Sequence, residues 1–372
     1  MATMRTLIVS AGAGTGHLRA GEALKQAMQA VEPRWKVALL DVLRLAPGWV
    51  RAAYGGGYEL VAAHAPSIWR EIYRWADGPQ EDHARWGSWA ERVLFRSFRR
   101  LLKAGAWDLC VCTHFLPAQL AAGRPGFPRF ALVVTDFTLH RYWAQERVTR
   151  YFVATEELAN GLRGRITRAQ VSVTGIPVSL AFSRPEPRDA ARRALGLAPD
   201  QPVAVLLGGG LGLHVEESAR ALVRGGPSEL QVLVICGRND AARERLVRAG
   251  LPARVQIRGY VDQLERFVSA ADVVITKPGG LTTSEALAMG RPLVLTRPLP
   301  GHEEGNLRAL VGMGAAIDGS EPELLARAVW ELFASPERLL ERRAAAAHAG
   351  RANAALRIAD ELRSELSSEA AA

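Results

Sequence analysis

The chain contains 372 residues, which is long for a single hydrophobic core and predicts two domains of roughly 150 to 200 residues each. Hydrophobic residues make up 48% of the sequence and charged residues 23%, and these ordinary fractions exclude disordered, collagen-like and coiled-coil proteins. No apolar run approaches the roughly 18 to 20 residues that a membrane span needs, and the N-terminus does not resemble a signal sequence, so we expect no membrane span and no secretion.

The net charge is +9, and it is unevenly distributed. Residues 1–180 carry 23 Lys and Arg against 14 Asp and Glu, whereas the rest of the chain carries 24 of each sign. The excess in the first half indicates an anionic partner, either a membrane surface or a nucleic acid; a basic face that contacts only solvent is the alternative. The three cysteines, Cys110, Cys112 and Cys236, are too few for a disulfide framework and indicate a reducing cytoplasm.

Short apolar runs bounded by turn-forming residues predict buried strands of parallel sheets. The predicted strands are residues 6–10, 37–41, 109–113, 130–135, 151–154, 203–207, 232–236, 255–258, 273–276 and 292–295. Helical patterns, such as those at 19–31 and 282–289, lie between most of them, so the alternation predicts an α/β protein with two doubly wound domains. The proline-rich segment 176–202 is the best linker candidate, and we place the domain boundary near residue 181.

The first predicted strand runs into a glycine-rich turn, Ser-Ala-Gly-Ala-Gly-Thr-Gly-His, over residues 10–17. Glycine is favoured where backbone amides and a helix N-terminus approach a ligand closely. The turn is not a dinucleotide fingerprint, because His17 occupies the third glycine position, and it lacks the Gly-Lys-Ser/Thr of a Walker loop. It places His17 at a helix N-terminus, where the dipole favours the neutral, proton-accepting imidazole; a capping or packing histidine is the alternative.

Residues 47–105 interrupt the alternation, because they hold five of the nine tryptophans and no predicted strand. We interpret them as a helical insertion, in which a capping box from Ser88 to Glu91 opens a helix. The basic residues of that helix lie largely outside its apolar face: they are Arg92, Arg96, Arg99, Arg100 and Lys103. Either this helix packs on the core with a solvated basic side, or its aromatic and basic residues contact a membrane interface.

Two further glycine turns follow predicted strands in the second half. The first begins with Gly208, Gly209 and Gly210, and the second places a Lys-Pro-Gly-Gly sequence at 277–280 before a helix. Such a turn and helix N-terminus can hold a diphosphate, although each turn alone could equally be structural. In the second turn, the amides and hydroxyls of Thr282 and Thr283 are expected to face the diphosphate oxygens, with charge from Lys277.

Two more groups of polar residues lie near this turn in the sequence. Glu285, one turn into the helix, is placed to accept two ribose hydroxyls. The sequence Pro-Gly-His-Glu-Glu-Gly-Asn at 300–306 combines acceptors and donors suited to sugar hydroxyls, and a solvated loop is the alternative.

Five motifs follow one another in the sequence: the His17 turn, the Gly-Gly-Gly turn, Gly-Tyr-Val-Asp at 259–262, Lys-Pro-Gly-Gly with Ser-Glu-Ala, and the 300–306 sequence. In this combination and order they resemble the monogalactosyldiacylglycerol synthase and processive diacylglycerol glucosyltransferase family. That family is related to the transferase that adds N-acetylglucosamine to make lipid II. The resemblance extends from Arg5 to about Asp318 and implies a GT-B fold, with two Rossmann-like domains facing a cleft. It implies an acceptor-binding domain at 1–180, a UDP-sugar-binding domain at 181–350 and a helical tail at 351–372.

The resemblance also implies the residues of the site. The implied donor-site residues are Gly208, Gly209, Gly210, Arg238, Asn239, Tyr260, Val261, Lys277, Gly279, Gly280, Thr282, Thr283, Glu285, Glu303, Glu304 and Asn306. Among them the glycine turns would contact the diphosphate, Glu285 the ribose, and the backbone of Tyr260 and Val261 the uracil. Glu303, Glu304 and Asn306 would bind the hexose. On the acceptor side lie Gly14, Gly16, His140 and Trp143, with Asp136.

We therefore expect an inverting hexosyltransferase that moves a hexose from a UDP-sugar to a membrane lipid such as diacylglycerol. His17, or alternatively Asp136, would deprotonate the acceptor hydroxyl, and Lys277 with the following helix N-terminus would stabilise the departing UDP. No Asp-x-Asp occurs in the sequence, so we expect no metal, and no cofactor besides the UDP-sugar co-substrate. Many relatives have Gln where this chain has His302, which leaves the identity of the hexose open.

The expected partners are a UDP-sugar, a lipid acceptor and an anionic membrane surface, with the protein bound peripherally to the cytoplasmic face of the cell membrane. Transfer to another lipid-linked or soluble acceptor, for example N-acetylglucosamine transfer, and UDP-sugar epimerisation are alternatives. Nucleic-acid binding is disfavoured, because the sequence contains paired glycine turns and no nucleic-acid motif.

Overall fold

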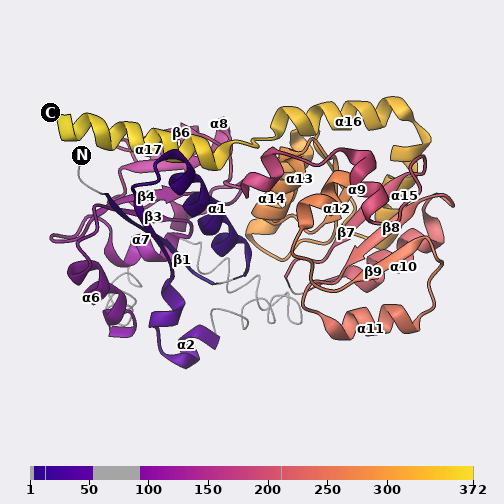
Figure 1. Ribbon diagram of the computed structural model, residues 1–372, viewed down its shortest axis with the longest axis horizontal. Coiled ribbons are helices and arrows are strands. Elements are labelled where there is room, and N and C mark those ends of the chain that lie inside the picture. Colours follow the sequence, from indigo (N-terminus) through magenta and orange to yellow (C-terminus); the bar gives the residue numbers. More distant parts are fainter. Residues whose placement is uncertain (1–3, 13, 53–92, 211, 372) are drawn as a thin grey trace. The chain divides into compact units, whose positions relative to one another are not determined.

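The computed structural model describes residues 4–12, 14–52, 93–210 and 212–371, and the chain divides into two compact units. Unit 1 comprises Met1–Leu180, Pro300–His302 and Asn353–Ala372, and unit 2 comprises Ala181–Leu299 and Glu303–Ala352. Each unit contains one six-stranded parallel sheet with helices packed around it (Figure 1). The α/β architecture with two parallel sheets is confirmed.

The sheet of unit 1 has the strand order β2-β1-β3-β4-β5-β6. Its strands are β1 (Arg5–Ser10), β2 (Lys36–Asp41), β3 (Leu109–Cys112), β4 (Arg129–Val133), β5 (Arg150–Val153) and β6 (Gln170–Val173). Its helices are α1 (Gly16–Val31), η1 (Val42–Leu45), α2 (Gly48–Ala52), α6 (Arg96–Ala104), α7 (Phe115–Ala121), η3 (Arg141–Trp143), α8 (Glu156–Arg165) and α17 (Ala354–Ala371), with η4 (Leu180–Ser183) at the boundary. Because β1 pairs with β2 on one side and with β3 on the other, the strand order reverses between β1 and β3. In doubly wound α/β folds, ligands bind beside the carboxyl ends of the two strands at such a reversal.

The C-terminal helix α17 belongs to the core of unit 1, although it lies far from that unit in sequence. Its buried side chains Ile358 and Leu362 join Leu24 and Met28 of α1 in one hydrophobic cluster. Arg150 of β5 forms ion pairs with Glu361 and Glu365 of α17, both at 2.6 Å. The helix α17 therefore packs beside α1 in the core of unit 1, and Figure 1 shows the two helices side by side.

The sheet of unit 2 has the order β12-β11-β10-β7-β8-β9. Its strands are β7 (Val203–Leu207), β8 (Gln231–Ile235), β9 (Val255–Arg258), β10 (Val273–Thr276), β11 (Leu293–Leu295) and β12 (Ala316–Asp318). Its helices are α9 (Arg188–Ala194), α10 (Val215–Gly225), α11 (Asp240–Arg248), α12 (Leu264–Ala270), α13 (Gly280–Ala288), α14 (His302–Gly312), α15 (Pro322–Ala334) and α16 (Pro336–Ala349). The order reverses between β7 and β10, so the loops after these two strands form the corresponding position of this unit.

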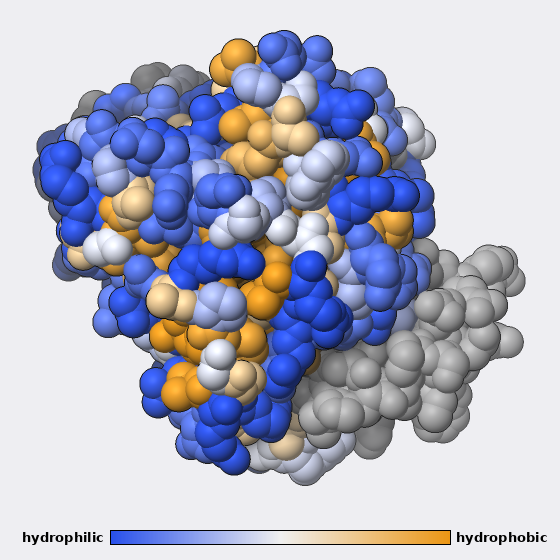
Figure 2. All heavy atoms as spheres, turned by 90° about the vertical axis from the view of Figure 1, so that its right-hand side faces the viewer, coloured by the Kyte–Doolittle hydropathy of each residue, from blue (hydrophilic) through white to orange (hydrophobic). Residues whose placement is uncertain are grey.

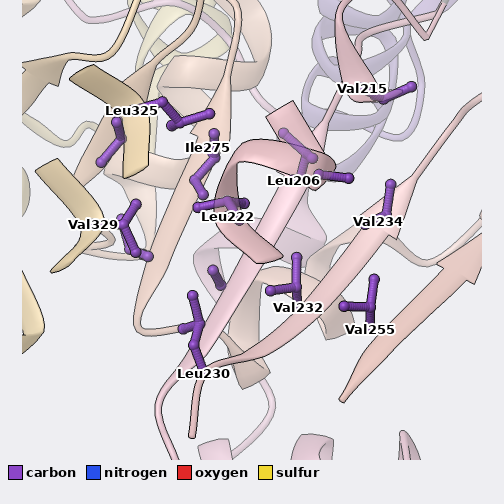
Figure 3. Packing of buried hydrophobic residues seen from close by; sticks show 14 of the residues in the cluster. Leu206, Val215, Leu222, Leu230, Val232, Val234, Val255, Ile275, Leu325 and Val329 are labelled. Atoms are coloured by element: carbon purple, nitrogen blue, oxygen red, sulfur yellow. The ribbon is translucent and has the colours of Figure 1, made fainter. Parts of the chain in front are cut away.

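The core of unit 2 is made by apolar side chains of the central strands and of helices on one face. Figure 3 shows Leu206 of β7, Val232 of β8 and Ile275 of β10 packed with Leu222 of α10 and Val329 of α15. Their relative exposure is 1% or less, as expected for strands that are covered on both faces. This packing fixes the carboxyl ends of β7 and β10, from which the glycine turns emerge.

The predicted insertion is described only at its two ends. Residues 53–92, which include Ser88, Arg92 and four of its five tryptophans, lie outside the described residues. The helix α6 begins at Arg96, and Phe98 and Leu102 are its buried residues, whereas Arg96, Arg100 and Lys103 are exposed. Within the described part, α6 thus packs on the core by its apolar side and exposes most of its basic residues, an arrangement that both alternatives for this helix share.

Three further observations concern membrane-spanning helices, the surface and the cysteines. Among the described residues no helix is long and apolar enough to cross a membrane. On the face shown in Figure 2, apolar residues lie in groups between hydrophilic ones. All three cysteines are buried and free.

Candidate functional site

The first glycine turn connects β1 to α1 at the strand reversal of unit 1. The Gly12 amide donates a hydrogen bond to Asp41 at 3.0 Å, and a Cβ on Gly12 would lie 2.7 Å from that carboxylate. Gly14 has a φ of +82°, which side chains rarely adopt, and Gly16 is the first residue of α1. The backbone conformation therefore requires glycine at 14, and glycine at 12 leaves room for the Asp41 carboxylate. The turn brings His17 into the first turn of α1.

The hydrogen bonds of His17 fix its tautomer. Its Nδ1 lies 3.1 Å from the carbonyl oxygen of Thr113 and 2.8 Å from the hydroxyl of Thr135. Because a carbonyl can only accept, the Nδ1 atom carries the proton, and the lone pair is on Nε2. The half-buried imidazole thus has Nε2 as its proton-accepting nitrogen, which is the form that a general base needs.

Two of the predicted acceptor-side residues, His140 and Trp143, lie around Asp136, which follows β4. The indole Nε1 of Trp143 donates to Asp136 Oδ2 at 3.1 Å, and His140 Nε2 lies 4.0 Å from the same oxygen. Asp136 is 5% exposed. The ring centroids of His17 and Trp143 are 6.4 Å apart, so His17, Asp136, His140 and Trp143 belong to one cluster of unit 1.

His114 is a member of this cluster that the sequence reasoning missed. Its ring lies edge-on to His17 with centroids 4.7 Å apart, and its Nδ1 accepts a hydrogen bond from the Leu116 amide, so it caps α7. Burial, together with the neighbouring His17 and His140, lowers the pKa of His114 well below its usual value. The available signal was its position, because His114 comes two residues after the last residue of β3, at the carboxyl end of that strand.

In unit 2 the Gly-Gly-Gly turn after β7 packs tightly against two other segments. A Cβ on Gly208 would lie 2.5 Å from the Gly212 backbone. Gly209 has a φ of +67°, and a Cβ on it would lie 3.0 Å from Lys277 Cε. The amide of Arg238 donates to the Gly210 carbonyl at 3.3 Å. The turns after β7, β8 and β10 therefore meet at the strand reversal.

The segment after β10 leads directly into α13. Gly279 is the N-cap of this helix and provides no side-chain cap, so the amides of the first turn, which starts at Gly280, point away from the helix. Thr282 is partly exposed there. Thr283 differs from the prediction: its hydroxyl is buried and donates to the carbonyls of Gly279 and Gly280, at 2.6 and 3.0 Å, instead of facing outward. Glu285 is also buried, at 1% exposure.

The helix α14 carries the three predicted hexose-binding residues, and it places them differently. Glu303 and Asn306 are 1% and 0% exposed, whereas Glu304 is partly exposed. Glu303 forms an ion pair with Lys277 at 2.5 Å, and Asn306 donates to the Pro278 carbonyl at 3.1 Å. Both side chains thus attach α14 to the turn that precedes α13.

The segments predicted to face the uracil lie after β8 and β9. The Arg238 guanidinium is 5.5 Å from the ring centroid of Tyr260, and Tyr260 is 62% exposed. The side chain of Asn239 accepts from the Ala242 amide and caps α11, while Val261 is partly exposed. The described residues contain no group of three or more His, Cys, Asp or Glu that could hold a metal ion.

Two family models match the chain in succession. The model for monogalactosyldiacylglycerol (MGDG) synthase matches residues 17–178, and the model for the glycosyltransferase family 28 C-terminal domain matches residues 207–360.

Curated proteins are similar over most of the chain. A probable monogalactosyldiacylglycerol synthase 2 of Oryza sativa subsp. japonica is 30% identical over 367 residues, which are 92% of this chain and 76% of the relative. A probable monogalactosyldiacylglycerol synthase of Glycine max is 29% identical over 88% of this chain, and a processive diacylglycerol beta-glucosyltransferase of Bacillus pumilus is 35% identical over 56%. The chain spans 65% and 55% of the length of these last two relatives.

Solved structures share the fold over nearly the whole chain. MurG of Acinetobacter baumannii has a TM-score of 0.63 at 18% identity, covering 97% of this chain and 99% of MurG. MnaA of S. aureus, in a co-structure with UDP, has a TM-score of 0.62 at 14% identity, covering 98% of this chain and 97% of MnaA. The predicted GT-B fold is therefore confirmed.

Proposed function

Because the chain belongs to the monogalactosyldiacylglycerol synthase family, we propose that it is an inverting transferase that moves a hexose from a UDP-sugar to a diacylglycerol-type lipid. Unit 1 binds the acceptor and unit 2 binds the UDP-sugar. The observation that carries this proposal is the position of His17 at the strand reversal of unit 1, where its Nδ1 donates to Thr113 and its Nε2 can accept the proton of an acceptor hydroxyl.

His17 accepts the proton of the acceptor hydroxyl in this mechanism. Its Nδ1 proton is held by Thr113 and Thr135, so the imidazole stays oriented while Nε2 gains a proton. The deprotonated oxygen attacks the anomeric carbon, the bond to the UDP oxygen breaks, and the configuration inverts. Asp136 supports this step less well as a base, because it is nearly buried and accepts the Trp143 indole.

The leaving UDP is stabilised by unit 2. The N-terminal amides of α13 and the ammonium of Lys277 supply positive charge at the turn where β7 and β10 end. The partly exposed Thr282 and the amides of Gly279 and Gly280 contact the diphosphate, together with Gly208, Gly209 and Gly210. Glu285 binds the ribose, and the backbone at Tyr260 and Val261 faces the uracil beside Arg238 and Asn239.

Attachment to the cytoplasmic face of the membrane is the further part of the proposal. In unit 1, η1 contacts both α2 and α6. Trp49 on α2 is 66% exposed, and Arg51 of α2 and Arg96 and Arg100 of α6 are exposed as well. An exposed tryptophan among arginines suits the headgroup region of an anionic membrane.

The test is incubation of the purified protein with UDP-galactose, UDP-glucose or UDP-N-acetylglucosamine and vesicles that contain diacylglycerol. Mass spectrometry of the lipids should show a hexosyl-diacylglycerol for one of the first two donors. A product on a soluble acceptor, or interconversion of UDP-sugars without any lipid product, would replace this function by one of the alternatives.

A further inference from the structure

Four arginines of unit 2 gather around one buried carboxylate. Asp272 is 3% exposed and directly precedes β10, and its Oδ2 accepts from the Val203 amide at the start of β7 at 2.9 Å. Because β7 and β10 are parallel, this carboxylate lies at the amino ends of the strands, opposite to the glycine turns at their carboxyl ends. The arginines come from three helices and one loop: Arg188 and Arg192 of α9, Arg291 before β11, and Arg343 of α16.

Two of these arginines are committed to the fold. Arg192 is 0% exposed, and its guanidinium donates to Asp272 Oδ2 at 2.7 Å and to three backbone carbonyls. Arg291 donates to two carbonyls at the end of α12, at 3.1 and 2.8 Å. Carbonyls satisfy the hydrogen bonds of these guanidiniums but carry no net charge, so the positive charge remains.

Arg188 and Arg343 are placed differently. The Nη2 atoms of both donate to the same oxygen, Asp272 Oδ1, at 3.0 and 2.6 Å, so the two guanidiniums lie side by side. Their side chains are 40% and 32% exposed. The Nε atom of Arg343 is buried, and no described residue accepts a hydrogen bond from it. Two adjacent guanidiniums, from α9 and α16, therefore reach the surface with donors that Asp272 does not use.

The charges of this cluster do not balance. Among the described residues, Asp272 is the only carboxylate that forms an ion pair with any of the four arginines. The exposed Asp189 adds a second, longer-range attraction to Arg192. Burial, and then the charge of Arg343, lowers the pKa of Arg291 to about 10, as expected where like charges are crowded. A bound anion would offset this repulsion.

We propose that Arg188 and Arg343 bind a phosphate group of a water-soluble molecule, at a surface site of unit 2 that is separate from the proposed donor site. A phosphate monoester carries about two negative charges, and its oxygens can accept from two guanidiniums at once. Residues 181–372 carry as many acidic as basic side chains, so this part lacks the excess of positive charge that attracts a membrane surface. A soluble phosphate compound therefore fits the site better than a lipid headgroup does.

Calorimetric titration of the full chain with inorganic phosphate tests this site, in saturating UDP and with sodium chloride holding the ionic strength constant. UDP occupies the donor site, so the remaining phosphate binding reports the arginine pair. Arg188→Gln and Arg343→Gln should each weaken phosphate binding about tenfold, since each removes a charged hydrogen-bond donor. Arg327→Gln, at an exposed arginine that pairs with Glu331, should bind phosphate like the wild type. A wild type that binds no phosphate, or Gln variants that bind it unchanged, would overturn the proposal.

Thermal unfolding keeps the test valid if a variant is less stable, because each protein is compared with itself. Phosphate should raise the Tm of the wild type above its value in chloride at equal ionic strength. It should not raise the Tm of the double variant Arg188→Gln/Arg343→Gln, and an equal rise in both proteins would contradict the site. Failure of UDP to bind would contradict the proposed function, whereas the arginine variants would still decide the phosphate site.

Two further probes distinguish the sources of the phosphate group. Glycerol 3-phosphate in solution should compete with inorganic phosphate, and vesicles of phosphatidylcholine and phosphatidic acid should bind the double variant as tightly as the wild type. A loss of vesicle binding in the double variant, without binding of either soluble compound to the wild type, would assign the arginines to a lipid headgroup and overturn the soluble ligand.

Discussion

At the scale of single residues, the proposed reaction depends on the lone pair at His17 Nε2. His17→Ala should lower kcat by about 10² to 10⁴ and leave UDP affinity nearly unchanged, because UDP is bound by unit 2. Steady-state kinetics and calorimetry together check this. Asp136→Asn is the matched control: a loss of kcat confined to that variant would assign the base to Asp136 and leave His17 as a contact of the acceptor.

The neighbouring His114 predicts a dependence of stability on pH. Burial lowers its pKa well below the ordinary histidine value of about 6.5, so the folded chain keeps it neutral where the unfolded chain takes up a proton. Its contribution is therefore complete above pH 6.5 and is lost as the pH falls below that value, by up to about 1.4 kcal/mol per pH unit. The free energy of unfolding, measured by denaturant titration from pH 7 to pH 5, should show this slope.

His114→Asn tests the assignment, since asparagine retains an acceptor that can cap α7. The variant should show a shallower slope, whereas His348→Asn at an exposed position should not alter it. An unchanged slope in His114→Asn would exclude His114 as the group responsible.

Thr282 and Thr283 are neighbours with different expected roles. Thr282→Ala should weaken UDP binding by about 1 kcal/mol, the net value of a typical hydrogen bond, with little effect on stability. Thr283→Ala should leave UDP affinity nearly unchanged and lower the free energy of unfolding, because its buried hydroxyl bonds within α13. Calorimetry and denaturant unfolding measure the two quantities, and equal losses of UDP affinity in both variants would contradict this division.

At the scale of elements, α17 is the clearest case of a segment whose role depends on a distant part of the chain. Ending the chain after Asn353 removes Ile358 and Leu362, each worth about 1.5 to 3 kcal/mol on full burial, and both carboxylates that form ion pairs with Arg150. Unit 1 should then unfold at a markedly lower temperature while unit 2 keeps its own transition in calorimetry. Ending the chain after Ser368, which retains Leu366, should change neither transition.

At the scale of the whole molecule, the positive charge of residues 1–180 predicts salt-dependent binding to anionic vesicles. Replacing Arg96 and Arg100 with Gln should weaken this binding by about 2 kcal/mol, roughly thirtyfold, if each arginine contributes about 1 kcal/mol near the surface. Vesicle sedimentation at low and high salt measures it. The control replaces two exposed arginines of unit 2, Arg248 and Arg327, by Gln, and should bind like the wild type.

A wild-type protein that stays in the supernatant with anionic vesicles at low salt would contradict the membrane proposal. An equal loss in both double variants would show that total charge, and not the α2 and α6 surface, determines binding.

The sequence by itself determined the alternation of strands and helices, because a buried strand and an amphipathic helix each leave a local hydrophobic pattern. It also located the glycine turns, since a tight approach of backbone to backbone requires glycine whatever the partner is. It missed β6 and β12, whose apolar patterns are weak because both are edge strands: β6 contains polar Gln170 and Ser172, and β12 ends in the exposed Asp318.

Only the tertiary structure decided which polar residues of each motif are buried. Thr282 and Thr283, or Glu303 and Glu304, are adjacent and chemically alike, so no local pattern separates the exposed member from the buried one. Glu303 differs from Glu304 because it pairs with Lys277, 26 residues earlier in the chain, and Thr283 differs from Thr282 because its side of α13 is buried. His17 depends in the same way on Thr113, 96 residues later. A hydrogen bond depends on the position of both partners, and the sequence specifies that position only through the packing of the whole unit.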